Sequence, residues 1–371
     1  MGETVLVTGG AGFIGRAVTT ELLSRGHRVR ILDSLIEQVH GDCERPSDLP
    51  EDAELIVGDI RNKDVVTRAL QGVDAVVHLA AEVGVGQSMY AVERYTSVNE
   101  TGSAVLFEAL IDRPVRRVVT ASSMSIYGEG LYEDADGNLV ENAVRMPRTS
   151  EAQGWDPVDA SGRTLRAVAT PEWKQPSLAS IYALGKFVQE RQTLIMTQAY
   201  GMEGVCLRLF NVYGPGQALS NPYTGVLAIF SSRLSNGQRP LVFEDGEQRR
   251  DFVHVGDVAR AFADALEHPR APGEVFNIGS GVERSINDVA RSIARSLGRN
   301  DVEPEITGKA RVGDIRHCFC DGSKAAAVLG FRATMPFDQG LAELADWVAG
   351  QTASDRVDEA RAELEAKGLV A

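Results

Sequence analysis

The amino-acid sequence predicts an α/β fold with a doubly wound parallel sheet. Short β-branched runs alternate with longer helical patterns along the first half of the chain, which is typical of parallel strands joined by crossover helices. A glycine-rich turn directly after the first run is a second sign of such a fold. The 371 residues are 43% hydrophobic and 24% charged, an ordinary globular composition.

The predicted elements divide the chain into two domains. Residues 1–208 carry strand-like runs at 4–8, 29–33, 54–59, 75–79, 117–121 and 204–208. A segment at about 249–278 is expected to return to this first domain. Residues 209–371 form a smaller C-terminal α/β domain, with helical patterns at 225–236, 255–268, 285–298 and 336–349. The charged tail at 354–371 is interpreted as a solvated helical appendage.

An insertion at about 129–178 interrupts the alternation. Asp134–Gly137 and Asp159–Gly162 have turn chemistry suited to two hairpins. The pair resembles two knuckles of a zinc ribbon without the cysteines, so we predict no metal there. A surface insertion is favoured over a direct contact with substrate.

Charge and composition exclude several classes of protein. A formal charge of -14 argues against nucleic-acid binding, and no apolar run approaches the roughly 20 residues that span a bilayer. The chain enters its first strand without the features of a secretory signal. The cysteines are too few and scattered for a disulfide framework, namely Cys43, Cys206, Cys318 and Cys320. We therefore expect a cytoplasmic protein with reduced thiols and no metal.

The glycine-rich turn predicts a dinucleotide site on a Rossmann-type domain. Gly9 precedes a G-x-G-x-x-G pattern that contains Gly12 and Gly15, follows a strand and opens a helix. Such a turn lets backbone amides approach a pyrophosphate. Asp33 ends the second strand, where its carboxylate can bind a ribose and repel a 2′-phosphate, so NAD is favoured over NADP. The other expected cofactor contacts are Phe13, Ile14, Ser34, Asp59, Ile60, Leu79, Ala80 and Ala81. Asp59 could instead cap the next helix.

Three residues form a candidate catalytic set. Ser123 follows the fifth strand, and Tyr182 and Lys186 have the i, i+4 spacing of one helix face. We expect the ammonium, helped by a positive nicotinamide, to lower the pKa of Tyr182. Tyr182 can then take the proton of a hydroxyl while hydride leaves for the cofactor, and Ser123 can hydrogen-bond the same oxygen. This predicts oxidation and reduction at a carbinol.

Together these ordered motifs resemble the extended short-chain dehydrogenase/reductase family, in its nucleotide-sugar epimerase/dehydratase branch. The resemblance covers about residues 3–349. It implies a Ser/Tyr/Lys set, bound NAD and a nucleoside diphosphate sugar in the cleft. It also implies that Asn99 and Phe210 contact the cofactor, with Tyr182 and Lys186.

The same resemblance assigns a substrate side. It implies substrate contacts by Ser123, Ser125, Asn211, Arg250, Arg311 and Asp314, the two arginines on phosphate and Asp314 on the nucleotide ribose. Two guanidinium groups suit a diphosphate because each can donate a pair of hydrogen bonds. The alternative is that both arginines are ordinary surface charges.

The positions after Ser123 distinguish the reactions of this branch. In the 4,6-dehydratases of this branch the next two positions resemble Asp-Glu, an acid and a base that remove water across C5 and C6. Its decarboxylases keep a Glu at the second position. Met124 and Ser125 cannot act as acid or base near neutral pH. The remaining reaction is 4-epimerisation, through a 4-keto sugar that turns and is reduced on its other face. A net NDP-sugar reductase or dehydratase, or a non-catalytic NAD-binding sensor, stays as an alternative.

Several stretches bear on the substrate. Residues 123–130, 217–225 and 313–318 resemble those of the family's dTDP-L-rhamnose 4-epimerase subgroup, which implies a dTDP-6-deoxysugar. UDP-glucose or UDP-glucuronate 4-epimerisation is the alternative. Cys318 falls where relatives place a gating side chain over the sugar. The family also implies a homodimer, formed through about 100–112 and 181–199.

Overall fold

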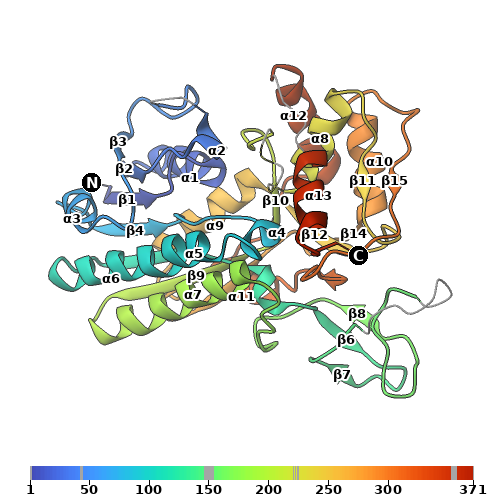
Figure 1. Cartoon of the computed structure of the whole chain (residues 1–371). Helices are drawn as coiled ribbons and strands as arrows, with labels where there is room; N and C mark the ends of the chain where they lie inside the picture. Colours follow the sequence, from blue (N-terminus) through green and yellow to red (C-terminus); the bar gives the residue numbers. More distant parts are fainter. Residues whose placement is uncertain are drawn as a thin grey trace.

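The centre of the protein is a seven-stranded parallel sheet. The structure is a computed structural model that describes residues 2–41, 45–145, 154–219, 221, 223, 225–351 and 357–370. The strand order is β3-β2-β1-β4-β5-β9-β13 (Figure 1). In chain order the strands are β1 Thr4–Thr8, β2 Arg28–Asp33, β3 Glu54–Val57, β4 Ala75–His78, β5 Arg117–Ser123, β9 Glu203–Leu209 and β13 Val275–Ile278. This order, which reverses direction between β1 and β4, confirms the doubly wound Rossmann-type fold.

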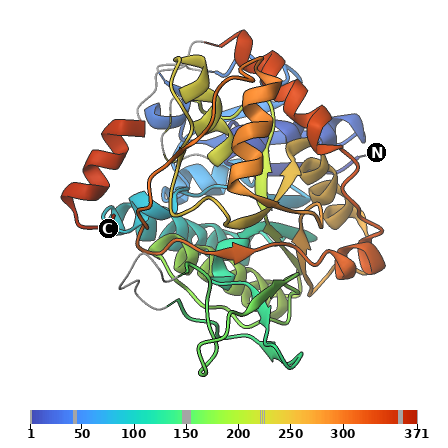
Figure 2. The same ribbon diagram turned by 90° about the vertical axis from the view of Figure 1, so that its right-hand side faces the viewer.

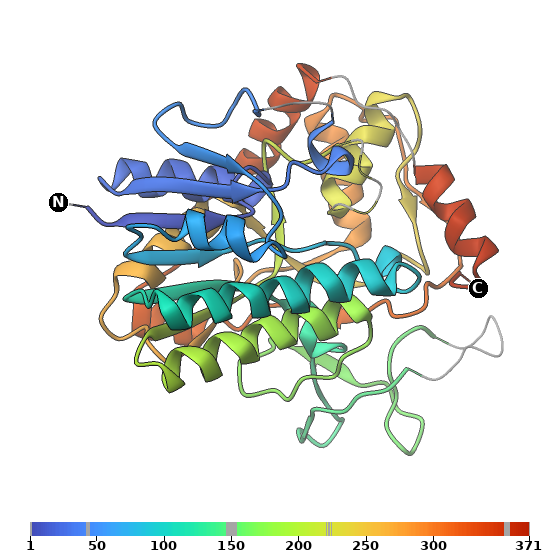
Figure 3. The same ribbon diagram turned by 60° about the vertical axis from the view of Figure 1, so that its left-hand side comes forward.

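Helices cover both faces of this sheet, which is why β4 and β5 are buried along their whole length. One face carries α1 (Phe13–Ser24), α9 (Val255–Glu267) and α11 (Ser323–Leu329). The other carries α3 (Lys63–Ala69), α6 (Gly102–Asp112) and α7 (Ile181–Ala199). Figure 3 shows α6 and α7 running side by side along this second face. Shorter helices are α2 Glu37–His40, α4 Val85–Ser88, α5 Val92–Thr96, η1 Ser97–Thr101 and η2 Met124–Tyr127.

A smaller α/β layer sits beyond the carboxyl ends of the strands. Its mixed sheet contains β10 (Asn211–Tyr213), β12 (Arg249–His254), β14 (Glu283–Ser285) and β16 (His317–Cys318), and β11 (Leu241–Val242) pairs with β15 (Glu305–Ile306). Its helices are α8 Val226–Ser235, α10 Ile286–Ser296, α12 Phe337–Ala349 and α13 Val357–Ala366. Of the segment 249–278, α9 and β13 join the large layer, whereas β12 pairs with β10 in the small one.

The insertion forms the two expected hairpins. β6 (Leu131–Glu133) pairs with both β7 (Leu139–Val140) and β8 (Arg166–Val168), and a bridge between Val158 and Thr164 closes the second turn. The insertion projects from the body of the molecule in Figure 1. Its residues 146–153, like Cys43, lie outside the described part of the chain. Among the described helices, none has the length and apolarity that a membrane span requires.

Candidate active site

A cavity of about 1050 Å³ lies between the two layers. Most of the residues expected to bind cofactor line it, namely Gly9, Gly12, Phe13, Ile14, Gly15, Asp33, Ser34, Asp59, Ile60, Leu79, Ala80, Ala81, Tyr182, Lys186 and Phe210. The expected substrate residues line it as well, namely Ser123, Ser125, Asn211, Arg250, Arg311 and Asp314. One continuous cavity thus brings both groups together.

The glycine turn fits a pyrophosphate. A Cβ on Gly15 would lie 2.4 Å from the Gly9 carbonyl oxygen, so only glycine lets α1 begin this close to the turn. Gly12, at the N-cap of α1, offers no side chain to cap the helix. The first amides of α1 are therefore left for an anionic ligand, and the helix dipole favours negative charge there.

Two carboxylates stand at neighbouring strand ends. Asp33 accepts hydrogen bonds from the backbone amides of Ala11, at 3.0 Å, and Leu35, at 2.9 Å, which holds it beside the glycine turn. Asp59 pairs with Arg61 at 2.6 Å, and this hydrogen bond lowers the pKa of Asp59. Asn62 caps α3, so the capping alternative for Asp59 is wrong.

Asn99 lies beside the cavity without lining it. Its Oδ1 accepts from the backbone amide of Glu82 at 2.7 Å, and its Nδ2 donates to the Glu82 carbonyl at 3.1 Å. Asn99 is fully buried. It therefore fixes the backbone of the segment that lines the cavity from Leu79 to Gly86.

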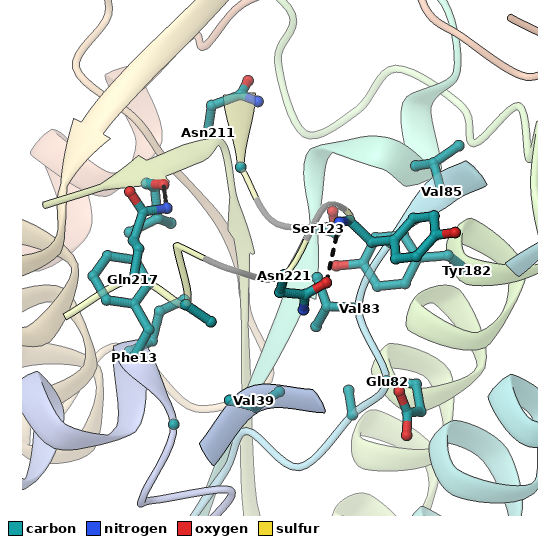
Figure 4. Close-up of a pocket in the computed structure, with 18 of the residues that line it drawn as sticks. Phe13, Val39, Glu82, Val83, Val85, Ser123, Tyr182, Asn211, Gln217 and Asn221 are labelled. Atoms are coloured by element: carbon teal, nitrogen blue, oxygen red, sulfur yellow. Dashed lines mark hydrogen bonds between the residues drawn. The ribbon is translucent and has the colours of Figure 1, made fainter. Parts of the chain in front are cut away.

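Ser123 and Tyr182 meet at the centre of the cavity (Figure 4). Ser123 is the last residue of β5, and Tyr182 stands in the first turn of α7, which Ser180 caps through the Ala183 amide. Both side chains line the cavity, and the Ser123 hydroxyl acts to lower the pKa of Tyr182. The Ser123 Oγ accepts a hydrogen bond from the Ser125 hydroxyl at 2.9 Å. The hydroxyls of Ser123 and Tyr182 can therefore both face one substrate oxygen.

Electrostatics at this centre differ from the expectation. Burial raises the pKa of Tyr182, and the hydrogen bond from Ser123 only partly opposes it, so the expected lowering by Lys186 is wrong for the protein alone. Burial also lowers the pKa of Lys186 to about 7. The Lys186 ammonium donates to Gln189 at 2.7 Å. Sequence reasoning missed Gln189, although its i+3 spacing from Lys186 was visible.

The substrate side carries clustered positive charge. Arg311 donates two hydrogen bonds to the Asp314 carboxylate, at 3.1 and 3.0 Å, and its guanidinium lies 4.5 Å from the Phe243 ring centroid. Arg250 donates to the carbonyls of Ile315 and Arg316. Burial raises the pKa of Asp314, but the charges of Arg311 and Arg250 outweigh burial and leave it below its ordinary value.

An unsatisfied polar atom also points to a ligand on this side. The Oδ1 of Asn211 is buried in the cavity wall and has no hydrogen-bond partner among the described residues. A buried acceptor without a partner costs free energy unless a ligand donates to it. This fits a polar substrate.

The insertion supports the substrate side from behind. Glu129 accepts from the backbone amides of Arg316 and His317, and Arg145 pairs with both Glu129 and Glu244. No described residue of 129–178 lines the cavity. The expectation of a surface insertion rather than a substrate contact therefore agrees with its placement.

Two expectations fail here. Cys318 is buried at 1% exposure in β16, where it packs beside Met124 and Ile315, and it is not among the described residues that line the cavity. The expectation that Cys318 gates the sugar is therefore wrong. The tail is not a solvated appendage either, because α13 lines the cavity with Ala360 and Leu364. Residues 354–356 and 371 lie outside the described part of that tail.

Comparison with known proteins agrees with this site. The model of the NAD dependent epimerase/dehydratase family matches residues 5–147 and 164–279. The chain is 38% identical to a dTDP-L-rhamnose 4-epimerase of Burkholderia thailandensis, over 94% of this chain and 95% of that protein. It is 32% identical to a UDP-glucose 4-epimerase of Mycolicibacterium smegmatis, over 92% and 97%.

Solved structures give the same answer. A UDP-glucose 4-epimerase of Thermotoga maritima with UDP-glucose has a TM-score of 0.76 at 29% identity, covering 93% of this chain and 98% of that one. A UDP-glucuronic acid 4-epimerase of Bacillus cereus, in complex with UDP-glucuronic acid and NAD, has a TM-score of 0.76 at 25% identity, covering 93% and 99%. The cofactor of the present site is NAD.

Proposed function

Because this chain belongs to the NAD-dependent epimerase/dehydratase family, we propose that it is a 4-epimerase of a nucleoside diphosphate sugar. As an NAD-dependent epimerase the enzyme is an isomerase. We choose epimerisation because Ser123 and Tyr182 line the same cavity, whereas Met124 and Ser125 supply neither an acid nor a base for dehydration or decarboxylation. Two carboxylates near this centre are already engaged: Glu82 pairs with Arg94 at 2.8 Å, and Glu190 pairs with Arg208 at 2.7 Å.

The chain's own residues manage the proton. Bound NAD supplies a reversible hydride acceptor, held by the glycine turn and Asp33. Tyr182 accepts a proton only as the phenolate, which positive charge from Lys186 and from bound NAD would favour. The phenolate takes the proton of the C4 hydroxyl at its Oη and later returns it, while Ser123 holds the same sugar oxygen. Lys186 keeps a positive charge close to the phenol. The 4-keto sugar turns within the cavity between the two halves of the reaction.

We propose dTDP-L-rhamnose, or a related dTDP-6-deoxysugar, as substrate. The 38% identity to a dTDP-L-rhamnose 4-epimerase supports this, against 32% for a UDP-glucose enzyme. Val83 and Val85 line the cavity together with Tyr182, and their apolar side chains suit a deoxy carbon. Glu82 lines the same wall but its charge is paired with Arg94, so it does not exclude a uronate. UDP-glucose or UDP-glucuronate remains the alternative.

The organisation we propose follows the two layers. Residues 1–208, with α9 and β13, hold the cofactor, and most of 209–371 forms the nucleotide-sugar side. We further propose a homodimer through α6 and α7, since both helices leave apolar side chains exposed. The free, buried thiols of Cys206, Cys318 and Cys320 fit a reducing cytoplasm.

A panel of dTDP- and UDP-sugars tests the function. Each sugar is incubated with purified full-length protein, and the ratio of C4 epimers is followed by NMR. We expect dTDP-L-rhamnose to equilibrate with its C4 epimer without net consumption of NAD. If dTDP-L-rhamnose is not epimerised but another sugar is, the proposed substrate is rejected and the 4-epimerase activity stands. No epimerisation of any sugar would reject the 4-epimerase, and net oxidation of NADH would indicate a reductase.

A further inference from the structure

The C-terminal segment 357–370 is fastened to the loop that carries Arg311. The backbone amide of Val312 donates to the Leu369 carbonyl at 2.9 Å, and Arg311 and Val370 form an antiparallel bridge. Lys309 pairs with Glu365 at 2.9 Å. The segment therefore adds a short strand-like contact beside a residue that we assign to the substrate.

The opposite side of α13 is fastened to the cofactor layer. The Glu363 carboxylate accepts hydrogen bonds from the phenols of Tyr90, at 2.9 Å, and Tyr223, at 3.0 Å, which also bond each other at 2.6 Å. Tyr90 follows α4, on the large layer. Figure 2 shows α13 apart from the other helices of the small layer, with the chain end beside the cyan segment that contains α4. The helix thus bridges the two layers.

The inner face of α13 forms part of the cavity wall. Val357, Ala360, Arg361 and Leu364 recur at helical spacing and line the cavity, as does Leu369. Leu364 is 7% exposed and lies about 3.5 Å from the position a Cβ on Gly86 would take. Gly86 directly follows Val85, and both line the cavity together with Tyr182. The wall therefore reaches from the sugar side of the cavity to Arg311.

We infer that segment 357–370 is a substrate-binding element, which walls in the nucleotide sugar and positions Arg311 for its diphosphate. The inference rests on the proposed function and deepens it. The glycine turn and Asp33, to which we assign the cofactor, make no hydrogen bond with the described residues of this segment. The segment should therefore affect substrate affinity and leave NAD in place.

A chain that ends at Gln351 tests this directly. Calorimetry with dTDP and with UDP gives nucleotide affinity, and released NAD gives cofactor content. We expect nucleotide affinity to fall, and KM for the sugar to rise, by about tenfold or more relative to the full chain, since wall contacts and a correctly held Arg311 are both lost. NAD content and kcat should change less than about threefold, the size of a modest contact loss.

Point variants keep the test valid if the shortened chain folds poorly. Glu363→Ala removes the acceptor for Tyr90 and Tyr223, and we expect KM to rise about threefold or more, with partial rescue in Glu363→Gln. The matched control is Asp346→Ala, an exposed acid on α12 that does not line the cavity. Its KM should equal that of the unchanged protein.

The outcomes separate the two proposals. Unchanged nucleotide affinity in the shortened chain and in Glu363→Ala would overturn the inference, and so would a full chain that binds neither nucleotide. A loss of NAD together with nucleotide would also overturn it, by showing a general structural role. Full-length protein that binds a nucleotide but epimerises no sugar would reject the epimerase, while nucleotide affinity would still decide the role of the wall.

Discussion

Lys186 donates a hydrogen bond from Nζ to the amide oxygen of Gln189 at 2.7 Å, and both side chains are buried. The Gln189 amide nitrogen in turn donates to Ser103 Oγ at 2.9 Å and to the Ala80 carbonyl at 3.2 Å. His78, next to this amide, has its pKa lowered to about 3 by burial and is neutral. The hydrogen-bond partner of the Lys186 ammonium is thus a neutral amide. Burying this charge without a carboxylate partner costs folding free energy.

Lys186→Met should stabilise the fold below neutral pH. Burial lowers the pKa of Lys186 from 10.5 to about 7, so the unfolded chain binds this proton more tightly than the folded protein. The cost of the buried charge is complete below about pH 7 and shrinks as pH rises toward 10.5. We expect a gain in the free energy of unfolding on the order of 5 kcal/mol at pH 6 that fades by pH 10, measured by urea unfolding.

The control for this change is Lys63→Met, because Lys63 is 61% exposed. It should give no such pH-dependent gain. A gain in Lys186→Met that is constant or grows with pH would contradict the assignment of the lowered pKa.

Gln189→Glu should raise the pKa of Lys186 by placing a carboxylate at hydrogen-bond distance from Nζ. The alkaline limb of the kcat/KM profile, where Lys186 loses its proton, should then move upward by about one pH unit or more. Gln198→Glu adds the same charge to an exposed position of α7 and should leave the limb in place. An unmoved limb in Gln189→Glu would exclude Gln189 as a positioning residue for Lys186.

What could be predicted from the sequence was local. The glycine turn, Ser123 at a strand end and the Tyr182–Lys186 spacing each follow from a few neighbouring residues. The direction of the Tyr182 pKa depends on burial by the whole fold, which spacing does not contain. The docking of α13 was missed for the same reason, because Glu363 bonds Tyr90, a residue distant in the chain.

Tyr182→Phe should lower kcat by about 10²- to 10⁴-fold, since it removes the group that accepts and returns the proton. NAD content should stay unchanged, because the glycine turn and Asp33 are intact. Epimer ratios by NMR measure the rate. Tyr200→Phe, at an exposed phenol just after α7, is the matched control and should keep full activity. If Tyr182→Phe stays active, the proposed proton transfer is wrong.

Asp33→Ser should weaken the preference for NAD over NADP. The Asp33 carboxylate, held by the amides of Ala11 and Leu35, repels a 2′-phosphate. We expect the ratio of the two dissociation constants to shrink by about tenfold or more, equivalent to at least one lost charge contact. Titration of cofactor-stripped protein with each dinucleotide measures this. Asp48→Ser offers a comparison at a half-exposed acid on the cavity rim, paired with Arg16. A ratio that Asp33→Ser leaves unchanged would place the ribose elsewhere.

Charge on the outer face of α7 should separate the proposed dimer. Leu184 and Ile195 are 39% and 55% exposed, and eleven residues bring a helix back to nearly the same direction, so both lie on one face. Ile111 on the adjacent α6 is 38% exposed and extends the apolar surface. The double change Leu184→Asp and Ile195→Asp should therefore yield monomers in light scattering after gel filtration, because desolvating two carboxylates opposes association. Val282→Asp, equally exposed outside these helices, should leave the mass of the assembly unchanged. A dimer that survives the double change must use another face of the protein.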